Sequence, residues 1–456
     1  MLKNRMFWAS VSMGLLLASG MGGCPGLFES LFGTNTDNTN NTDSNNVDIN
    51  NNDTTDANST VNDNNNNDNL GLDFVLTKIR THVQGHMAVG DDLIAFAAVT
   101  DSGGPDGVAF IIPSEGDTTA REIPGGADFA ENSFAVSKNG KIWLINNFVV
   151  TIYDTVKDTS TVLDTNDIRP VNIPVDPEAA GHTQSSGNYF VTRNDAGIVT
   201  DGAIVKVIDV SSDTPDIISF PKNPGGVTSG FQVPMVGIDA TTMQVVAVAN
   251  DIFYVYDMTD PNADPAEFDV SALGGIDTDT QFKFDGMHIL YHDDSTKPVA
   301  MLLDISTAGN KPVELDNNPA SGAIELVDGR FAFFTQESLG SDYQSAIGTA
   351  SAAPSSTIAA DDNPIDGSTT NNGYFGWGQT LAIELNAAVW WMAGDDNVGS
   401  GSYLQRSTGG AFSTIADPEG ADDYGLPASD VNVSENTLSF KYGVDTETYV
   451  GYAILN

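Results

Sequence analysis

The chain has 456 residues, and its 62 acidic side chains outnumber its 18 basic ones to give a formal net charge of −44. Phosphate contacts need Lys and Arg, so this balance argues against nucleic acid as a partner and against direct adsorption to anionic lipid headgroups. The acidity favours solubility in a salty or extracellular medium, with divalent-cation binding as the alternative.

The N-terminus has the anatomy of a secretory signal. Two basic residues, Lys3 and Arg5, precede an uncharged apolar stretch at 6–21, and small residues then lead to Cys24. This apolar stretch is shorter than the roughly 20 residues that cross a bilayer as a helix. Residues 1–23 are therefore expected to be a cleaved signal peptide, and an uncleaved anchor is the alternative.

Cys24 is the only cysteine in the chain, so no disulfide can form within it. The stretch Met21-Gly22-Gly23-Cys24 resembles the lipobox of bacterial lipoproteins, although that family usually has Leu in place of Met21. The resemblance implies that Cys24 is acylated and anchors the protein in the cell envelope. Pro25 and not an acidic residue follows the cysteine. By the usual sorting rule of lipoproteins, the resemblance therefore implies an outer-membrane location.

Residues 24–71 are expected to form a lipidated N-terminus followed by a tether. Positions 34–69 contain sixteen Asn and seven Asp, with no Lys, Arg or aromatic residue. A segment with so little hydrophobicity and charge of one sign cannot bury a core, so it is predicted to be disordered. Its aspartates lack the Gly and closing Glu of an EF-hand loop, so calcium binding is not expected there.

The remainder, 72–456, consists of short β-branched and aromatic runs separated by turn-forming residues, which is typical of an all-β domain. A hairpin recurs eight times at intervals of 43 to 57 residues. The first strands of these hairpins are predicted at 93–96, 142–145, 189–191, 245–248, 288–291, 331–334, 388–391 and 438–440.

A second feature repeats with the same period. Four partner strands end in an apolar residue followed by aspartate, at Asp154, Asp209, Asp257 and Asp304. With room for two more strands between hairpins, each repeat has the size of a four-stranded propeller blade. The pattern resembles WD-repeat, YVTN-type and quinoprotein-like propellers, and this resemblance implies an architecture and no particular family.

The expected fold is therefore a single β-propeller with eight four-stranded blades. Seven blades, or two β-sandwich domains, are the alternatives. The last hairpin reaches the final residues without an outermost strand, whereas the strand-like segment 73–79 precedes the first complete blade. This N-terminal segment is expected to pair beside the last blade and close the ring, which would protect its open edges.

The sequence has no sialidase-type Asp box and no Trp-bearing repeat of quinone-binding propellers. The helical zinc motif His-Glu-x-x-His is also missing. The five histidines include two pairs spaced four apart, His82 with His86 and His288 with His292, and a metal site at the axis is an open alternative. His292 is expected to open a hydrated loop. Calcium in the acidic loops 101–106 and 260–264 is possible, but such residues also suit hairpin turns.

The most unusual patch is 371–378, where Tyr374, Phe375 and Trp377 lie among glycines. Exposed rings there would bind a glycan or a protein; the alternative is that they fill space between blades. The function expected is a noncatalytic, membrane-anchored module that binds an envelope protein or glycan. The alternative is an extracellular polysaccharide hydrolase or lyase with paired carboxylates at the propeller axis.

Overall fold

The fold is taken from a computed structural model, which describes part of the chain, all of it within the compact unit Asn58–Asn456. The described residues are 74–77, 82–99, 105–116, 120–125, 134–146, 148–171, 183–277, 282–295, 298–315, 320–336, 343–349, 359–360, 365–366, 373–374, 381–384, 389–395, 402–407, 412–414, 428–444 and 447–455. Cys24, the tether, Phe375 and Trp377 lie outside these ranges.

Regular structure in the described residues is β-strand, apart from three short 3-10 helices. The helices are η1 (Pro113–Glu115), η3 (Gly230–Gln232) and η4 (Ser271–Leu273). No helix within the described ranges is long and apolar enough to span a membrane. The prediction of an all-β domain is therefore confirmed.

The strands form sheets of consecutive antiparallel members, numbered here in chain order. Sheet 1 contains β2 (His82–Gly90), β3 (Leu93–Val99), β4 (Pro105–Ile111) and β5 (Arg121–Glu122). Sheet 2 contains β6 (Phe134–Val136), β7 (Lys141–Asn146), β8 (Val149–Asp154) and β9 (Thr159–Val162). Sheet 3 contains β10 (Thr183–Ser186), β11 (Tyr189–Arg193), β12 (Val205–Asp209) and β13 (Asp216–Phe220). Sheet 4 contains β14 (Val236–Asp239), β15 (Gln244–Ala249), β16 (Ile252–Asp257) and β17 (Ala266–Asp269).

The second half of the domain repeats this pattern with two wider sheets. Sheet 5 contains β18 (Lys283–Phe284), β19 (His288–His292), β20 (Ala300–Asp304) and β21 (Val313–Glu314). Sheet 6 contains β22 (Ala320–Val327), β23 (Arg330–Gln336), β24 (Tyr343–Thr349), β25 (Ala359–Ala360) and β26 (Ile365–Asp366). Sheet 7 contains β27 (Gly373–Tyr374), β28 (Leu381–Ile383), β29 (Val389–Asp395), β30 (Ser402–Ser407) and β31 (Phe412–Thr414).

Sheet 8 joins the two ends of the domain. It has the order β1-β34-β33-β32, with β1 (Phe74–Thr77), β32 (Ala428–Ser434), β33 (Thr437–Val444) and β34 (Glu447–Ile454). In the antiparallel register of its outer pair, Phe74 faces Ala453 and Thr77 faces Val450. The outermost strand of this sheet therefore comes from the N-terminal end of the described domain.

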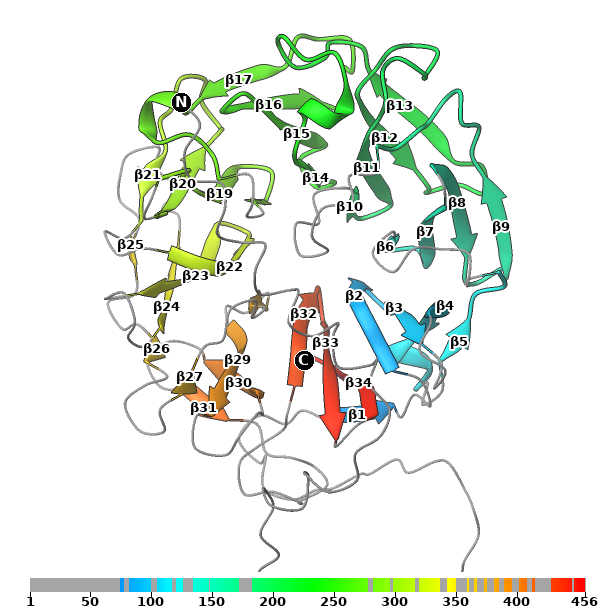
Figure 1. Cartoon of the computed structure of the whole chain (residues 1–456), viewed down its shortest axis with the longest axis vertical. Coiled ribbons are helices and arrows are strands. Elements are labelled where there is room, and N and C mark those ends of the chain that lie inside the picture. The colour runs from blue at the N-terminus through cyan, green and yellow to red at the C-terminus, as the bar shows by residue number, and fades with distance from the viewer. Residues whose placement is uncertain are drawn as a thin grey trace, which may run out of the picture. The chain divides into compact units, whose positions relative to one another are not determined.

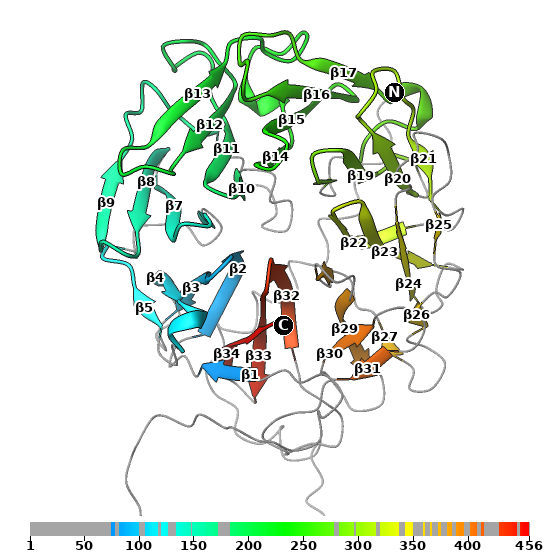
Figure 2. The same ribbon diagram turned by 180° about the vertical axis from the view of Figure 1, so that it is seen from behind.

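The sheets are arranged around a common axis (Figures 1 and 2). The first strand of each sheet contacts the first strand of the next, from β2 through β6, β10, β14, β18 and β22. The series continues from β22 to β28 of sheet 7, then to β32, and from β32 back to β2. Antiparallel sheets packed radially in this way form a β-propeller.

Apolar side chains fill the spaces between neighbouring sheets. Val191 and Phe220 of sheet 3 pack with Val236 and Tyr256 of sheet 4 in one buried cluster. Comparable clusters join other neighbours along the described domain. Because the middle strands are covered on both faces, they contain continuous apolar runs rather than an alternating pattern. This two-sided burial explains why the hairpins are recognisable in the sequence.

The alternating strand direction gives the propeller two kinds of surface. Connections from the second to the third strand, and from each sheet to the next, emerge at one end of the strands, here called the loop face. Connections from the first to the second strand, and from the third to the fourth, emerge at the other end, the turn face.

The recurrent aspartates are turn formers on the turn face. Each is the last residue of a third strand, and its Oδ1 accepts a hydrogen bond from the backbone N–H two residues later. The distances are 3.1 Å for Asp154, 2.8 Å for Asp209, 2.7 Å for Asp257 and 2.8 Å for Asp304. Such side-chain to backbone bonds initiate turns, so the repeated residue has a structural role.

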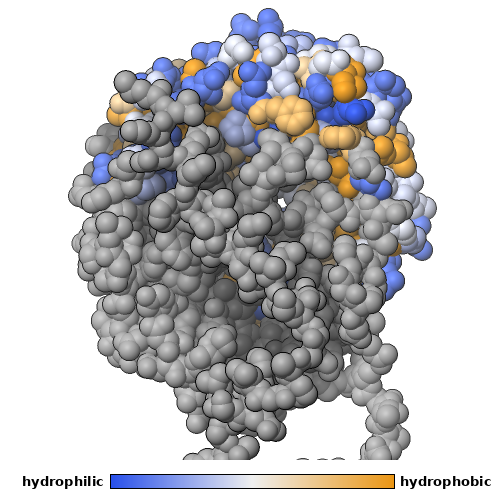
Figure 3. All heavy atoms as spheres, viewed as in Figure 1, coloured by the Kyte–Doolittle hydropathy of each residue, from blue (hydrophilic) through white to orange (hydrophobic). Residues whose placement is uncertain are grey.

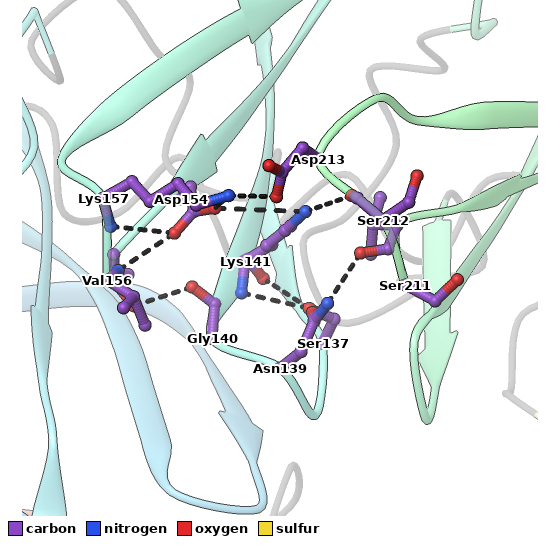
Figure 4. A network of polar contacts seen from close by, with 12 residues as sticks. Ser137, Asn139, Gly140, Lys141, Asp154, Val156, Lys157, Ser211, Ser212 and Asp213 are labelled. Atoms are coloured by element: carbon purple, nitrogen blue, oxygen red, sulfur yellow. Dashed lines mark hydrogen bonds and ion pairs between the residues drawn. The ribbon is translucent and has the colours of Figure 1, made fainter.

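Polar contacts between turns join neighbouring sheets on the turn face (Figure 4). Asn139 of sheet 2 donates from Nδ2 to the Val210 carbonyl at 2.6 Å, and buried Lys141 donates from Nζ to the Ser212 carbonyl at 2.5 Å. Lys157 pairs with Asp213 beside them. Sheets 2 and 3 are therefore fixed by directional bonds as well as by apolar packing.

Candidate functional site

Most of the predicted ligand contacts are not described by the structure. Cys24, Phe375 and Trp377 lie outside the described residues. Tyr374 ends β27, where its backbone pairs with Gly394 of β29. The aromatic patch and the lipidation site therefore stay predictions.

The prediction that His292 opens a hydrated loop is wrong. His292 ends β19 with 1% of its surface exposed, and its Nε2 atom has no hydrogen-bond partner. Burial lowers the pKa of this imidazole to about 4, and Asp293 opposes the shift. The side chain is therefore buried in its neutral form, because an uncompensated charge there would cost free energy.

His288 lies at the other end of the same strand and behaves differently. Its Nδ1 atom is 3.3 Å from Oδ2 of Asp285. Burial opposes protonation of His288, but the hydrogen bond and the charge of Asp285 outweigh it and raise its pKa. No group of three or more His, Cys, Asp or Glu side chains suited to a metal occurs among the described residues. His292 is thus buried and neutral, whereas His288 is partly buried and paired with Asp285.

Carboxylates on the innermost strands have local partners. Asp239 of β14 accepts hydrogen bonds from the Thr241 N–H at 2.9 Å and from the Thr242 hydroxyl at 2.9 Å. Glu325 of β22 pairs with Lys283 of β18 at 2.9 Å. These two carboxylates belong to sheets 4 and 6, and each is held by its own local partner.

The loop face carries a group of exposed apolar side chains. Phe148, Ile198, Phe231 and Leu273 are 37%, 43%, 53% and 40% exposed, respectively. We call these four residues the loop-face patch. Phe148 and Ile198 lie in connections within sheets 2 and 3, whereas Phe231 and Leu273 lie in the segments that lead from sheet 3 to sheet 4 and from sheet 4 to sheet 5. Figure 3 shows hydrophobic residues exposed among hydrophilic ones in the upper part of the view.

Phe148 has an unfavourable backbone conformation. It follows β7 in a tight hairpin connection, and its φ of 68° lies in the left-handed region. Bulky residues rarely adopt this conformation, which Gly and Asn tolerate. The Arg169 guanidinium carbon lies 5.0 Å from the centre of the Phe148 ring, a cation–π geometry. An aromatic ring is therefore held at the surface despite backbone strain.

Hydrogen bonds connect the loops that present the patch. The Asp195 N–H donates to the Arg169 carbonyl at 3.1 Å, and the Ile198 N–H donates to the Asp195 carbonyl at 3.0 Å. The Gly230 N–H donates to the Asn194 carbonyl at 3.2 Å. These bonds link Phe148, through Arg169, to Ile198 and to the helix η3 that carries Phe231.

The η3 turn is itself fixed. The Ser229 hydroxyl accepts the Phe231 N–H at 3.3 Å, and Oε1 of Gln232 accepts the Ser229 N–H at 3.1 Å, which together form a capping box. A Cβ atom at Gly230 would collide with the Asn194 carbonyl oxygen. Glycine therefore allows the close approach that positions Phe231 over sheet 3.

The patch extends toward sheet 5 through two more contacts. Asn250 donates from Nδ2 to the Gly225 carbonyl at 3.4 Å. Asp251 accepts the Ile276 N–H at 3.0 Å, next to the η4 turn that ends at Leu273. Side chains from three successive sheets are thus presented on one connected set of loops.

Sequence reasoning did not identify this patch. Each of its residues is a single apolar residue within a polar loop, which is common on protein surfaces and carries no motif. The one usable signal was Phe148 in a short connection between two apolar strands, where Gly or Asn is expected. The grouping itself depends on the order of the sheets around the axis.

No family model matches the sequence, and no curated protein matches it. Solved structures of similar fold include the WD40 domain of SCAP from fission yeast, at 9% identity over 84% of this chain and 98% of that chain, with a TM-score of 0.46. Another is the β-propeller domain of the Trilobed protease from Pyrococcus furiosus, at 10% identity over 82% and 96%, with a TM-score of 0.43.

The tricorn protease is also similar, at 13% identity over 80% of this chain with a TM-score of 0.36, and this chain spans 36% of its length. At such identities and scores the similarity is one of fold alone. They carry no argument about activity or ligand.

Proposed function

We propose that this protein is a noncatalytic binding module of the cell envelope, held to the outer membrane by lipid on Cys24. Its domain is a propeller of eight blades closed by the N-terminal strand β1. The partner is an envelope macromolecule that binds the loop face. The observation that carries this proposal is the loop-face patch: Phe148, Ile198, Phe231 and Leu273 are exposed together on hydrogen-bonded loops.

Two features support binding over a purely structural role. Loops on a rigid scaffold are the usual place for recognition residues, because they change without disturbing the core. Aromatic rings and Arg side chains carry much of the free energy of protein interfaces, and Phe148 of the patch lies against the Arg169 side chain. Tyr374, Phe375 and Trp377 are further proposed ligand contacts.

The eight sheets and the position of β1 support the closed-ring part of the proposal. Each first strand contacts the next around the axis, and β1 pairs with β34 of the sheet that precedes sheet 1. With this pairing the ring resists separation between its terminal sheets. β1 is the outermost strand of sheet 8, so the proposed tether joins the domain at an outer strand.

Site-specific photo-cross-linking in the native cell tests the binding role. A benzophenone amino acid replaces Ile198 on the loop face in one full-length variant and Val156 on the turn face in the other. Val156 is 79% exposed, so it is a matched apolar control. We expect a discrete adduct at position 198 and not at position 156; no adduct at 198, or equal adducts at both, would contradict the proposal.

Metabolic labelling with radioactive palmitate tests the anchor separately. We expect the native chain to be labelled and the Cys24→Ala chain to be unlabelled. Equal labelling of the two chains would refute lipidation at Cys24.

A further inference from the structure

The loop-face patch lies in an acidic surrounding. The described loops that present it or join its members are 163–171, 194–204, 221–235, 250–251 and 270–277. They contain six aspartates, at positions 164, 167, 195, 201, 251 and 277, and two basic residues, Arg169 and Lys222. The apolar side chains are therefore bordered mainly by negative charge.

Both basic residues have partners, and one of the acids is paired with a lysine. Arg169 lies over the Phe148 ring, and Lys222 is 3.4 Å from Asp264. Asp201 is paired with buried Lys206 at 2.8 Å. Asp164 and Asp167 are exposed on the loop that carries Arg169, and Oδ1 of Asp164 accepts hydrogen bonds from the backbone and side-chain N–H groups of Asn166 at 2.8 Å. The field around the patch thus favours a cationic partner over an anionic one.

The side-chain types of the patch favour a protein partner over a glycan. Sugars stack on flat aromatic faces, and one face of the Phe148 ring is already covered by Arg169. Ile198 and Leu273 are aliphatic, so they offer branched surfaces without a ring. Such surfaces suit the aliphatic side chains of a polypeptide, whose burial is favoured by the hydrophobic effect.

We propose that the loop-face patch binds a protein segment in which apolar side chains alternate with Lys or Arg. This inference rests on the proposed binding function and specifies its partner. The apolar side chains of the segment contact Ile198, Phe231 and Leu273, and its cationic groups lie against Asp164 and Asp167. Long-range attraction speeds encounter, and apolar contact slows release.

Three fluorescein-labelled peptides of equal length are the probes for the full-length protein. One contains Leu, Lys and Gly, the second contains Leu, Glu and Gly, and the third contains Lys and Gly only. We expect the Leu–Lys peptide to bind tightest in fluorescence anisotropy, and its affinity to fall with added salt. Equal or tighter binding of the Leu–Glu peptide, or of the peptide without Leu, would overturn the proposal.

Paired variants assign the binding to the patch. We expect Ile198→Ser with Phe231→Ser to weaken Leu–Lys peptide binding about ten-fold or more, since two buried contacts are lost. Val156→Ser on the turn face is the control and should leave binding unchanged. Equal effects of the loop-face and turn-face changes would show nonspecific attraction to an acidic protein and would overturn the proposal.

A charge-matched pair avoids any change in the apolar surface. Asp167→Lys alters the border of the patch, whereas Asp260→Lys makes the same change in net charge in an exposed turn between β16 and β17. We expect Asp167→Lys to weaken Leu–Lys peptide binding several-fold more than Asp260→Lys. Equal weakening would contradict the proposal. An adduct at position 198 without peptide binding would reject this partner chemistry and leave the binding function standing.

Discussion

At the scale of single residues, Phe148 shows a conflict between stability and exposure. Its φ of 68° is unfavourable for a bulky side chain, yet the ring remains partly exposed and covered by Arg169. The left-handed conformation destabilises a residue with a Cβ by roughly 1–2 kcal/mol, and an exposed cation–π contact stabilises the fold by about 0.5–1 kcal/mol. Local strain of this kind occurs often at binding sites.

Replacement of Phe148 by Asn tests this balance. Asn tolerates the left-handed region, so we expect Phe148→Asn to raise the free energy of unfolding by up to about 1 kcal/mol. Urea denaturation of the two proteins measures the difference, and the Leu–Lys peptide should bind the variant more weakly. A loss of stability of more than about 1 kcal/mol would show that the ring has a mainly structural role.

The aspartates show what sequence reasoning detects at this scale. Asp154, Asp209, Asp257 and Asp304 were recognised as periodic because each ends a third strand. Their role as turn formers could be read only from the hydrogen bonds that each makes to the following backbone. A periodic residue identifies the repeat unit, but its contact decides whether it binds a ligand or forms a turn.

At the scale of one strand, β19 carries two histidines with opposite pKa shifts. Burial lowers the pKa of His292 to about 4, and the contact with Asp285 raises that of His288. The sequence predicted that residues four apart share a face of the strand. It did not predict this difference, because the surroundings of each ring depend on its position along the strand and on Asp285.

The pKa of His292 predicts a pH-dependent stability. Between pH 6.5 and 4 the unfolded chain binds a proton at this position that the folded chain does not, so stability falls as the pH falls. At about 1.4 kcal/mol per pKa unit, the loss is about 2 to 4 kcal/mol. We expect His292→Leu to remove this loss of stability between pH 6.5 and 4. Denaturation at successive pH values measures the free energy of unfolding of both proteins.

A matched variant in the same strand supplies the control. His288 has a raised pKa, so it stabilises the fold when protonated and loses that contribution as the pH rises through its folded pKa. His288→Gln should therefore keep the fall in the free energy of unfolding between pH 6.5 and 4 that His292 causes. If the free energies of unfolding of His292→Leu and the native chain change in parallel from pH 6.5 to 4, the conclusion that His292 is buried in its neutral form is wrong.

At the scale of the whole domain, the sequence predicts best the strands that are buried in every repeat. The middle strands are apolar on both faces because neighbouring sheets pack against them, and this pattern located the hairpins of the described sheets. The segment 73–79 was recognised as strand-like for the same reason, and β1 pairs with β34 in the structure. Repetition thus reveals the unit and its strands.

The loop-face patch was not predictable from the same signals. Ile198, Phe231 and Leu273 are far apart in the sequence, and their loops have turn-forming composition like every other connection. They come together because successive sheets place equivalent loops side by side. Local patterns contain no information about such a grouping until the order and direction of the sheets are known.

The proposed closed ring depends on the pairing of β1 with β34. Two engineered cysteines test this directly in a Cys24→Ala background. Facing residues of antiparallel strands have Cα atoms about 4.5–5.5 Å apart, within the range that a disulfide spans. Phe74 and Ala453 face each other, whereas Phe74 and Ala300 belong to different sheets and form a control pair.

We expect the Phe74→Cys, Ala453→Cys protein to form an intramolecular disulfide under air oxidation, seen as a linked peptide pair by mass spectrometry. The Phe74→Cys, Ala300→Cys control should keep both thiols free. Free thiols in both proteins, or a disulfide only between molecules, would contradict the pairing of β1 with β34 and with it the closed propeller.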